Sequence, residues 1–139
     1  MPEKAQTEGA LSTAGLAMPN GGLQVVNPSK AVYDLIVAAL GDEKTMSYEF
    51  ADQSLLSDVF PGRWVALPYI YNALKTLRWP DVHAPIWRDE SVKNVHYILS
   101  PKPWENPRDT QTEETMKWWW DVNEDRLEKE KKTAIADGF

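Results

Sequence analysis

The sequence predicts an α/β fold, and two kinds of pattern predict it. Apolar residues recur at helical spacing in residues 29–40 and 51–59, and again in a C-terminal segment that starts near residue 110. Between the second and third of these segments, residues 94–99 form a short, partly alternating apolar segment that is typical of a strand. A chain of 139 residues can bury one modest core.

The first third of the chain should contain one strand and one helix. Residues 1–18 are small and polar without a clear period, so we expect a disordered leader there. Residues 22–27 read as a strand that Pro28 ends. Ser29 is a suitable N-cap for a helix that runs to about Leu40, where Gly41 occupies the usual C-cap position.

The middle of the chain should contain a second helix and then mostly irregular segments. The helix at residues 51–59 turns Leu55, Leu56 and Val59 inward, and Pro61-Gly62 ends it. Residues 72–77 are compatible with either a short helix or a turn. The segment at 94–99 is the best strand of the sequence.

The last helix should start at a capping box formed by Thr110 and Glu113. Its inner face would carry five residues at helical spacing: Met116, Trp119, Trp120, Asn123 and Leu127. Since Trp118, Trp119 and Trp120 cannot share one helix face, at least one should meet another chain, another domain or the rim of a cleft. We assign most of the seven Trp residues to the core.

Composition excludes several classes of function. The net charge is −6 and no basic patch is visible, so nucleic acid is not an expected partner. The absence of Cys excludes disulfides and Cys-based zinc sites. No segment reaches the roughly 18 apolar residues of a spanning helix, and residues 10–18 do not form a signal peptide's apolar region. We therefore expect a soluble, cytoplasmic protein without a membrane partner.

The most informative segment is Val95–Trp104, VHYILSPKPW, which leads from the predicted strand into a turn. Prolines on both sides of Lys102 restrict its backbone. A neutral imidazole from His96 and a fixed ammonium from Lys102 are groups that suit a divalent cation and a diphosphate. The plainer alternatives are a structural His and a surface Lys.

Together with two upstream segments, PNGGLQVVNPSKAVYDLI (Pro19–Ile36) and ADQSLLSDVFPGRWVALPYIYNAL (Ala51–Leu74), this segment resembles glycosyltransferase family 8. That family includes glycogenin and galactinol synthase-like enzymes, and the latter similarity continues through KWWWDVNEDRLEKEKK. The resemblance covers Met18–Arg108. It implies a nucleotide-diphospho-sugar transferase fold (GT-A, Rossmann-like) and Mn²⁺-dependent, retaining hexosyl transfer from a UDP-sugar to a carbohydrate acceptor.

The resemblance assigns roles to particular residues. His96 matches the metal ligand and Lys102 the diphosphate contact. Asp52 and Gln53 match the pair near the reacting centre, and Asn20, Gly21 and Gly22 match the turn at the donor sugar. Glu49 stands where relatives often carry Asp, so its role at the donor sugar is less certain. Asp52 could instead cap its helix, and Asn20 could simply form a turn.

Two departures from the family pattern matter. Many members carry Gly midway between the His and the Lys, where this chain has Leu99. The Asp-x-Asp motif of the donor-binding half, which supplies metal-binding carboxylates, does not occur in this sequence. The resemblance therefore divides the chain into a leader (1–18), the C-terminal part of the transferase domain (19–108) and a C-terminal helix (109–139).

Without the donor-binding half, the chain alone should be weakly active or inactive, and its use of Mn²⁺ is doubtful. Two alternatives stay open. The chain could complete its site with a second copy or a separate donor-binding chain, or it could be a non-catalytic carbohydrate-binding or scaffold protein. No Tyr follows Trp104, which argues against self-glucosylation of a tail within this chain.

Overall fold

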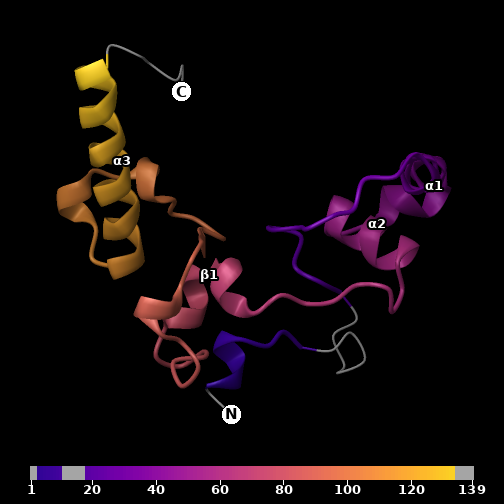
Figure 1. Cartoon of the computed structure of the whole chain (residues 1–139), viewed down its shortest axis with the longest axis horizontal. Helices are drawn as coiled ribbons and strands as arrows, with labels where there is room; N and C mark the ends of the chain where they lie inside the picture. The colour runs from indigo at the N-terminus through magenta and orange to yellow at the C-terminus, as the bar shows by residue number, and fades with distance from the viewer. Residues whose placement is uncertain (1–2, 11–17, 134–139) are drawn as a thin grey trace.

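The computed structural model describes residues 3–10 and 18–133. Its main elements are α1 (Lys30–Leu40), α2 (Ala51–Val59), α3 (Glu114–Thr133) and a two-stranded parallel sheet of β1 (Ala73–Leu74) and β2 (Val95–His96). Short 3-10 helices connect them. Figure 1 shows α1 and α2 on one side, α3 on the other, and the sheet between them. The arrangement is compatible with part of an α/β domain.

The two predicted helices of the first half are confirmed. Ser29 precedes α1 with an extended backbone, and its carbonyl accepts the Tyr33 N–H, although its side chain makes no capping hydrogen bond. α1 packs against α2, which places Leu55 in the core. Gly62 turns the chain after α2 with a φ of 65°, a conformation that favours glycine.

The predicted strand at residues 22–27 is wrong. These residues are irregular and exposed, with Val25 and Val26 at 81% and 71% exposure. A strand needs a neighbour that satisfies its N–H and C=O groups, and the described residues provide none beside this segment. β-Propensity alone does not supply that partner.

The predicted strand at residues 94–99 is confirmed only at Val95 and His96. These residues pair with Ala73 and Leu74, respectively, so His96 lies at a defined register. The ladder stops there because Ile98 donates to the carbonyl of His96, which starts a turn. Leu99 then adopts a positive φ of 61°. β1 also resolves the open choice at 72–77, since a two-residue strand runs there into a 3-10 helix (Lys75–Arg78).

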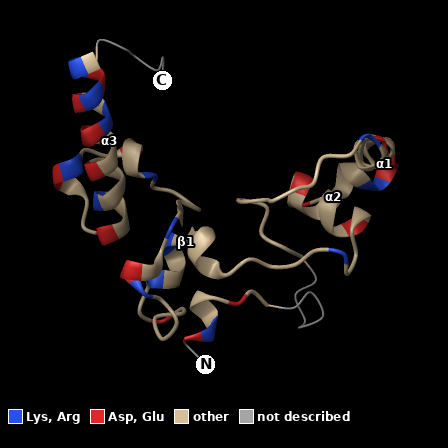
Figure 2. Ribbon diagram, viewed as in Figure 1, with Lys and Arg blue, Asp and Glu red and all other residues tan. Residues whose placement is uncertain are grey.

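The last helix is confirmed, but its capping box is wrong. Thr110 lies in a 3-10 helix (Arg108–Thr110), where its hydroxyl donates to the carbonyl of Pro107, and α3 begins only at Glu114. Met116 is buried, whereas the outer end of the expected inner face at Leu127 is 38% exposed. Beyond Trp120 the helix therefore leaves the core. Acidic and basic side chains alternate along it, several as i,i+4 pairs (Figure 2).

The three adjacent Trp residues all find contacts within the chain. Trp119 packs edge-on against Trp120 and also lies beside Trp104. The indole N–H of Trp120 donates to the carbonyl of Pro103, and Trp118 lies under the guanidinium of Arg78. The run thus attaches α3 to the turn that follows β2.

The first residues described do not form the loose leader that the sequence suggests. Lys4–Gln6 form a 3-10 helix next to Tyr69–Tyr71, and Gln6 donates to the carbonyl of Ile86. Gly9 lies so close to Ala66 that a Cβ there would come within 1.7 Å of the carbonyl oxygen. Residues 11–17, also expected to be disordered, lie outside the described part.

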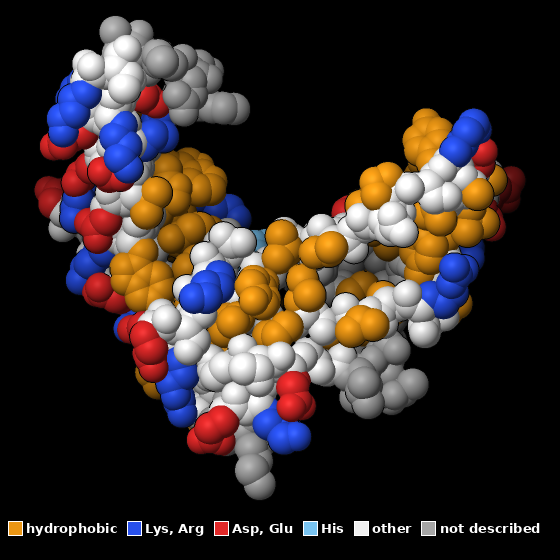
Figure 3. Space-filling model, viewed as in Figure 1, with side chains coloured by type: hydrophobic (Ala, Val, Ile, Leu, Met, Phe, Trp, Pro, Cys, Tyr) orange, Lys and Arg blue, Asp and Glu red, His pale blue; other side chains and the backbone are white. Residues whose placement is uncertain are grey.

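The chain exposes an unusually large surface. Its accessible area is 10083 Å², whereas a folded monomer of 15.8 kDa exposes about 7,300 Å². Figure 3 shows hydrophobic side chains gathered along the hollow between the α1–α2 pair and α3. Among the described helices, none is both long and apolar enough to cross a bilayer.

Candidate functional site

Asn20 organises the turn that precedes the irregular segment at 22–27. Its side-chain oxygen accepts the Gly22 N–H at 2.9 Å and the side-chain amide of Asn72 at 2.8 Å. The first bond is an Asx turn, the plainer interpretation of an Asn-Gly sequence. The second bond joins this turn to the residue just before β1, 52 positions later. Asn20 is therefore both a turn residue and a tertiary contact.

Gly21 links the same turn to α2. Its N–H donates to the side-chain oxygen of Gln53 at 2.8 Å, and the Gln53 amide in turn contacts the sulfur of Met18. A Cβ built on Gly21 would lie 3.5 Å from Oδ2 of Asp52. The Asp52-Gln53 pair thus faces the Asn20–Gly22 turn.

Gly22 links the turn to β2. A Cβ at this position would lie 2.5 Å from both Cε1 and Nδ1 of the His96 ring and 2.9 Å from Oδ1 of Asn72. No ordinary side chain fits there without displacing the imidazole. The His96 ring therefore occupies the space that a side chain at position 22 would fill.

The surroundings of His96 favour its neutral imidazole form. Burial lowers the pKa of His96, and the nearby charge of Lys102 lowers it further. Its Nδ1 is buried and has no hydrogen-bond partner among the described residues. A neutral ring with an unpaired nitrogen is chemically suited to a metal ion or a polar ligand atom.

Lys102 approaches the same region from the turn after β2. Its ammonium donates to the carbonyl of Tyr97, and its backbone N–H donates to the Glu105 carboxylate at 2.9 Å. Leu99, which stands where many family members carry Gly, holds the left-handed backbone that glycine adopts most easily. Leu99 thus places a side chain on a backbone conformation in which it is strained.

Of the two acidic residues Glu49 and Asp52, only Asp52 lies beside the Asn20–Gly22 turn. Glu49 is exposed, and within the described part of the chain it makes no hydrogen bond or ion pair with the other site residues. Asp52 does not cap α2: Phe50 holds the N-cap position without a side-chain cap, and Ser54 accepts the Phe50 N–H instead. Asp52 lies in the first turn, where a carboxylate complements the helix dipole. The functional roles assigned to all these residues stay predictions.

Sequence reasoning missed Asn72 and Lys75. Asn72 stands directly before β1, and a polar residue before the buried Ala73 was the available signal. Lys75 is 2% exposed and donates to the carbonyls of Leu99 and Pro101. Nothing in a sequence distinguishes such a lysine from the surface lysines that are far more common.

The described residues do not form a Mn²⁺ site. They contain no group of three or more His, Asp or Glu side chains placed to hold a metal ion. His96 alone supplies one ligand, which is too few for a stable site in a protein. The described cluster offers the imidazole of His96, the ammonium of Lys102, the carboxylate of Asp52 and three side-chain amides, those of Asn20, Gln53 and Asn72.

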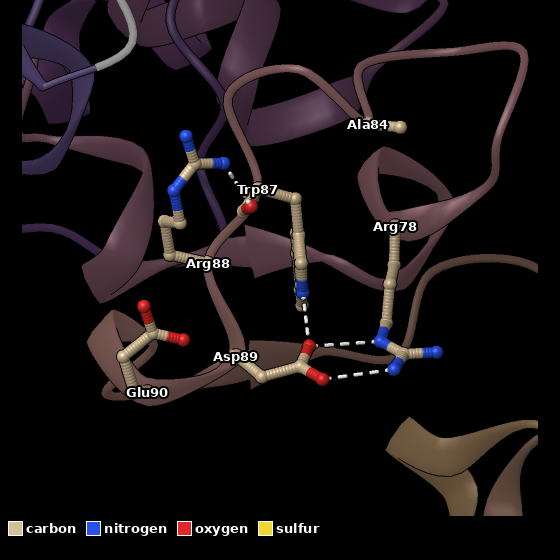
Figure 4. Close-up of a pocket in the computed structure, with 6 residues that line it drawn as sticks. All are labelled: Arg78, Ala84, Trp87, Arg88, Asp89 and Glu90. Carbon is tan, nitrogen blue, oxygen red and sulfur yellow. Dashed lines mark hydrogen bonds and ion pairs between the residues drawn. The ribbon is translucent and has the colours of Figure 1, made fainter.

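A pocket of about 370 Å³ lies elsewhere and includes none of these residues. Figure 4 shows Asp89 between Arg78, which it binds through two hydrogen bonds of 2.8 Å, and the indole N–H of Trp87. The Arg88 guanidinium donates to backbone carbonyls of Pro85 and Trp87. These contacts tie together the loop between β1 and β2.

Comparison with known proteins supports the resemblance over part of the chain. Glycogenin of Neurospora crassa is 30% identical over 109 residues, which cover 74% of this chain and 16% of that protein. Glycogenin of Komagataella phaffii is 26% identical over 98 residues, covering 61% of this chain and 24% of that protein. No family model matches, and no solved structure gives a significant match. The chain spans less than a quarter of the length of these relatives, and over the matching region it is related to the glycogenin-like glycosyltransferases.

Proposed function

We propose that this chain carries one face of a family 8 hexosyltransferase site, with a UDP-sugar as donor and a carbohydrate as acceptor. The observation that carries the proposal is the meeting of three distant segments. The Asn20–Gly22 turn contacts both the Asp52-Gln53 pair and His96, and Lys102 lies close enough to lower the pKa of His96. These are the residues to which the family resemblance assigns donor contacts.

Each side chain has a task that matches its chemistry. The Lys102 ammonium would leave the Tyr97 carbonyl and neutralise charge that develops on the leaving diphosphate. Asp52 would accept hydrogen bonds from sugar hydroxyls, while Gln53 and Asn20 would exchange their present partners for them. His96 would contact the diphosphate or its cation through its imidazole ring.

The proposal includes a GT-A, Rossmann-like arrangement in which the donor-binding half lies outside the matched region. Two observations support a site completed by another chain or domain: the excess of exposed surface, and the absence of a metal-binding cluster from the described residues. Because carboxylates normally share the metal with the His, this chain alone should bind Mn²⁺ and the donor weakly. Retention of configuration and a hexose as the transferred sugar follow from the resemblance alone.

Isothermal titration of UDP-glucose and UDP-galactose, with and without Mn²⁺, tests the proposal. The expected result is saturable binding, strengthened by Mn²⁺, that is lost in His96→Ala and in Lys102→Ala. Lys93→Ala is the matched control, because Lys93 is an exposed lysine just before β2. A folded sample that shows no heat at millimolar donor would contradict a donor site on this chain alone.

A second candidate is a non-catalytic carbohydrate-binding or scaffold protein that uses an exposed aromatic surface. The exposed Trp104, at 56%, favours this candidate because an aromatic ring can stack on the apolar face of a sugar. Titration with an oligosaccharide in the absence of nucleotide and metal distinguishes the two. Light scattering over a range of concentrations shows whether a second copy completes the site.

A further inference from the structure

Among the described residues, Lys75 is the one buried charged group, and the proposed site does not use it. Its side chain follows β1 directly and is 2% exposed, among the largest fully buried side chains of the described residues. No carboxylate in the described part of the chain pairs with it. A buried ammonium is costly unless hydrogen bonds replace its water, so its partners identify what it does.

The two backbone carbonyls that Lys75 contacts flank Ser100. The Lys75 ammonium donates to the carbonyl of Pro101 at 2.7 Å and to that of Leu99 at 3.4 Å, on either side of Ser100. Leu99 has a φ of 61°, which a leucine does not hold without support. The two hydrogen bonds supply that support, because they fix the carbonyls that flank the bend.

The same contacts tie Lys102 to His96. β1 pairs Leu74 with His96, and the next residue, Lys75, holds the turn that leads into Lys102. One short segment of chain therefore sets both the register of the imidazole and the position of the ammonium that follows it.

We propose that Lys75 is a positioning residue: its buried ammonium fixes the Leu99–Pro101 turn and thereby holds Lys102 beside His96. The role assigned to Lys102 as a diphosphate contact rests on the proposed function. The positioning of Lys102 does not, because it can be measured without any donor.

The test is site-resolved reductive methylation of lysines in the full chain, read by peptide mass spectrometry. In Lys75→Met, Lys102 should be labelled about fivefold faster than in the wild type, because its turn opens locally. Lys93 and Lys117, which make no contact with the turn, should keep their rates. Lys75→Arg restores a buried cation with several donors and should return the rate at Lys102 towards the wild-type value.

An unchanged Lys102 rate in folded Lys75→Met overturns the proposal. So does an equal rise at Lys93 and Lys117, which would mean that Lys75 only stabilises the whole fold. If Lys75→Met does not fold, the wild type decides: under increasing urea, Lys75 and Lys102 should become reactive along one curve. Exposure of Lys102 at a lower urea concentration than Lys75 overturns the proposal that Lys75 positions Lys102.

Donor titration of the same variants separates this inference from the proposed function. Lys75→Met should weaken UDP-glucose binding as much as Lys102→Ala does, and the double variant should be no weaker than Lys102→Ala. Absence of donor binding to the wild type contradicts the proposed function but leaves the labelling result decisive for Lys75. Additive losses in the double variant count against positioning through Lys102.

Discussion

Gly22 lies directly against the imidazole of His96, and the ring occupies the space where a side chain at position 22 would lie. A Cβ on Gly22 would come within 2.5 Å of the ring, and the Oδ1 of Asn72 blocks a sideways shift at 2.9 Å. Contacts this short do not occur between real side chains, so either the ring or the backbone must move. The placement of His96 therefore depends on the absence of a side chain 74 residues earlier in the sequence.

Gly22→Ala should lower the free energy of unfolding by about 1–3 kcal/mol, the usual cost of adding a methylene group where no space exists. Urea unfolding followed by circular dichroism measures the change. Gly21→Ala is the matched control, since its Cβ would meet its neighbours at 3.4–3.6 Å, which is close to ordinary contact. Equal stability of the two variants would show that the turn and the ring are not packed as described.

Leu99→Gly should stabilise the chain relative to Leu99→Ala by about 1 kcal/mol, because both variants lose the same exposed side chain but only glycine relieves the positive φ. The comparison uses alanine because it keeps the Cβ that causes the strain. Thermal or urea unfolding gives the difference. If the alanine variant is the more stable one, residue 99 does not hold the left-handed conformation in solution.

Local sequence patterns predicted the helices of this chain better than its sheet. α1 and α2 follow from the spacing of Val32, Ile36, Leu55 and neighbouring apolar residues, because a helix satisfies its backbone hydrogen bonds internally. A strand requires a partner that the pattern does not name. Residues 22–27 lack one, and β2 keeps only the two residues that pair with β1.

Only those site residues that belong to a family motif could be predicted from the sequence. The cluster that includes His96 contains six other residues named from the resemblance, namely Asn20, Gly21, Gly22, Asp52, Gln53 and Lys102. Asn72 and Lys75 escaped because their importance comes from what they touch 52 and 26 positions away, which only the folded chain reveals. Glu49, by contrast, matched a motif position but is exposed without a contact to the cluster.

Acid should weaken the loop between β1 and β2 through Asp89. Hydrogen bonding from Arg78 lowers the pKa of Asp89, with the Trp87 indole contributing. A carboxyl group whose pKa is lower in the folded state adds stability above its unfolded value near 3.8, and loses it as the pH falls below that value. The pair is partly exposed, so the contribution should be under about 1 kcal/mol.

Arg78→Gln removes the main cause of this shift and should raise the pKa of the Asp89 carboxyl, as followed by NMR between pH 2 and 6. The variant should also lose part of the acid dependence of unfolding. Arg63→Gln is a suitable control, because Arg63 lies beside Phe60 and not beside the loop. An unaltered titration of Asp89 in Arg78→Gln would rule out the two-point contact seen in Figure 4.

Trp120→Phe should destabilise the attachment of α3 to the turn that carries Lys102. The indole N–H of Trp120 donates to the carbonyl of Pro103 at 3.1 Å, and Pro103 is fully buried. Phenylalanine keeps an aromatic ring beside Trp119 but removes the donor, which leaves the carbonyl to the weaker contact with Gln111 at 3.3 Å. The expected loss is about 1–2 kcal/mol in the free energy of unfolding, measured by urea titration.

Trp79→Phe is the control. The Trp79 ring is 40% exposed and makes no ring contact or hydrogen bond within the described part of the chain, so the substitution should cost little in the same urea titration. Equal costs at the two positions would mean that the Trp120–Pro103 hydrogen bond does not hold α3 in place.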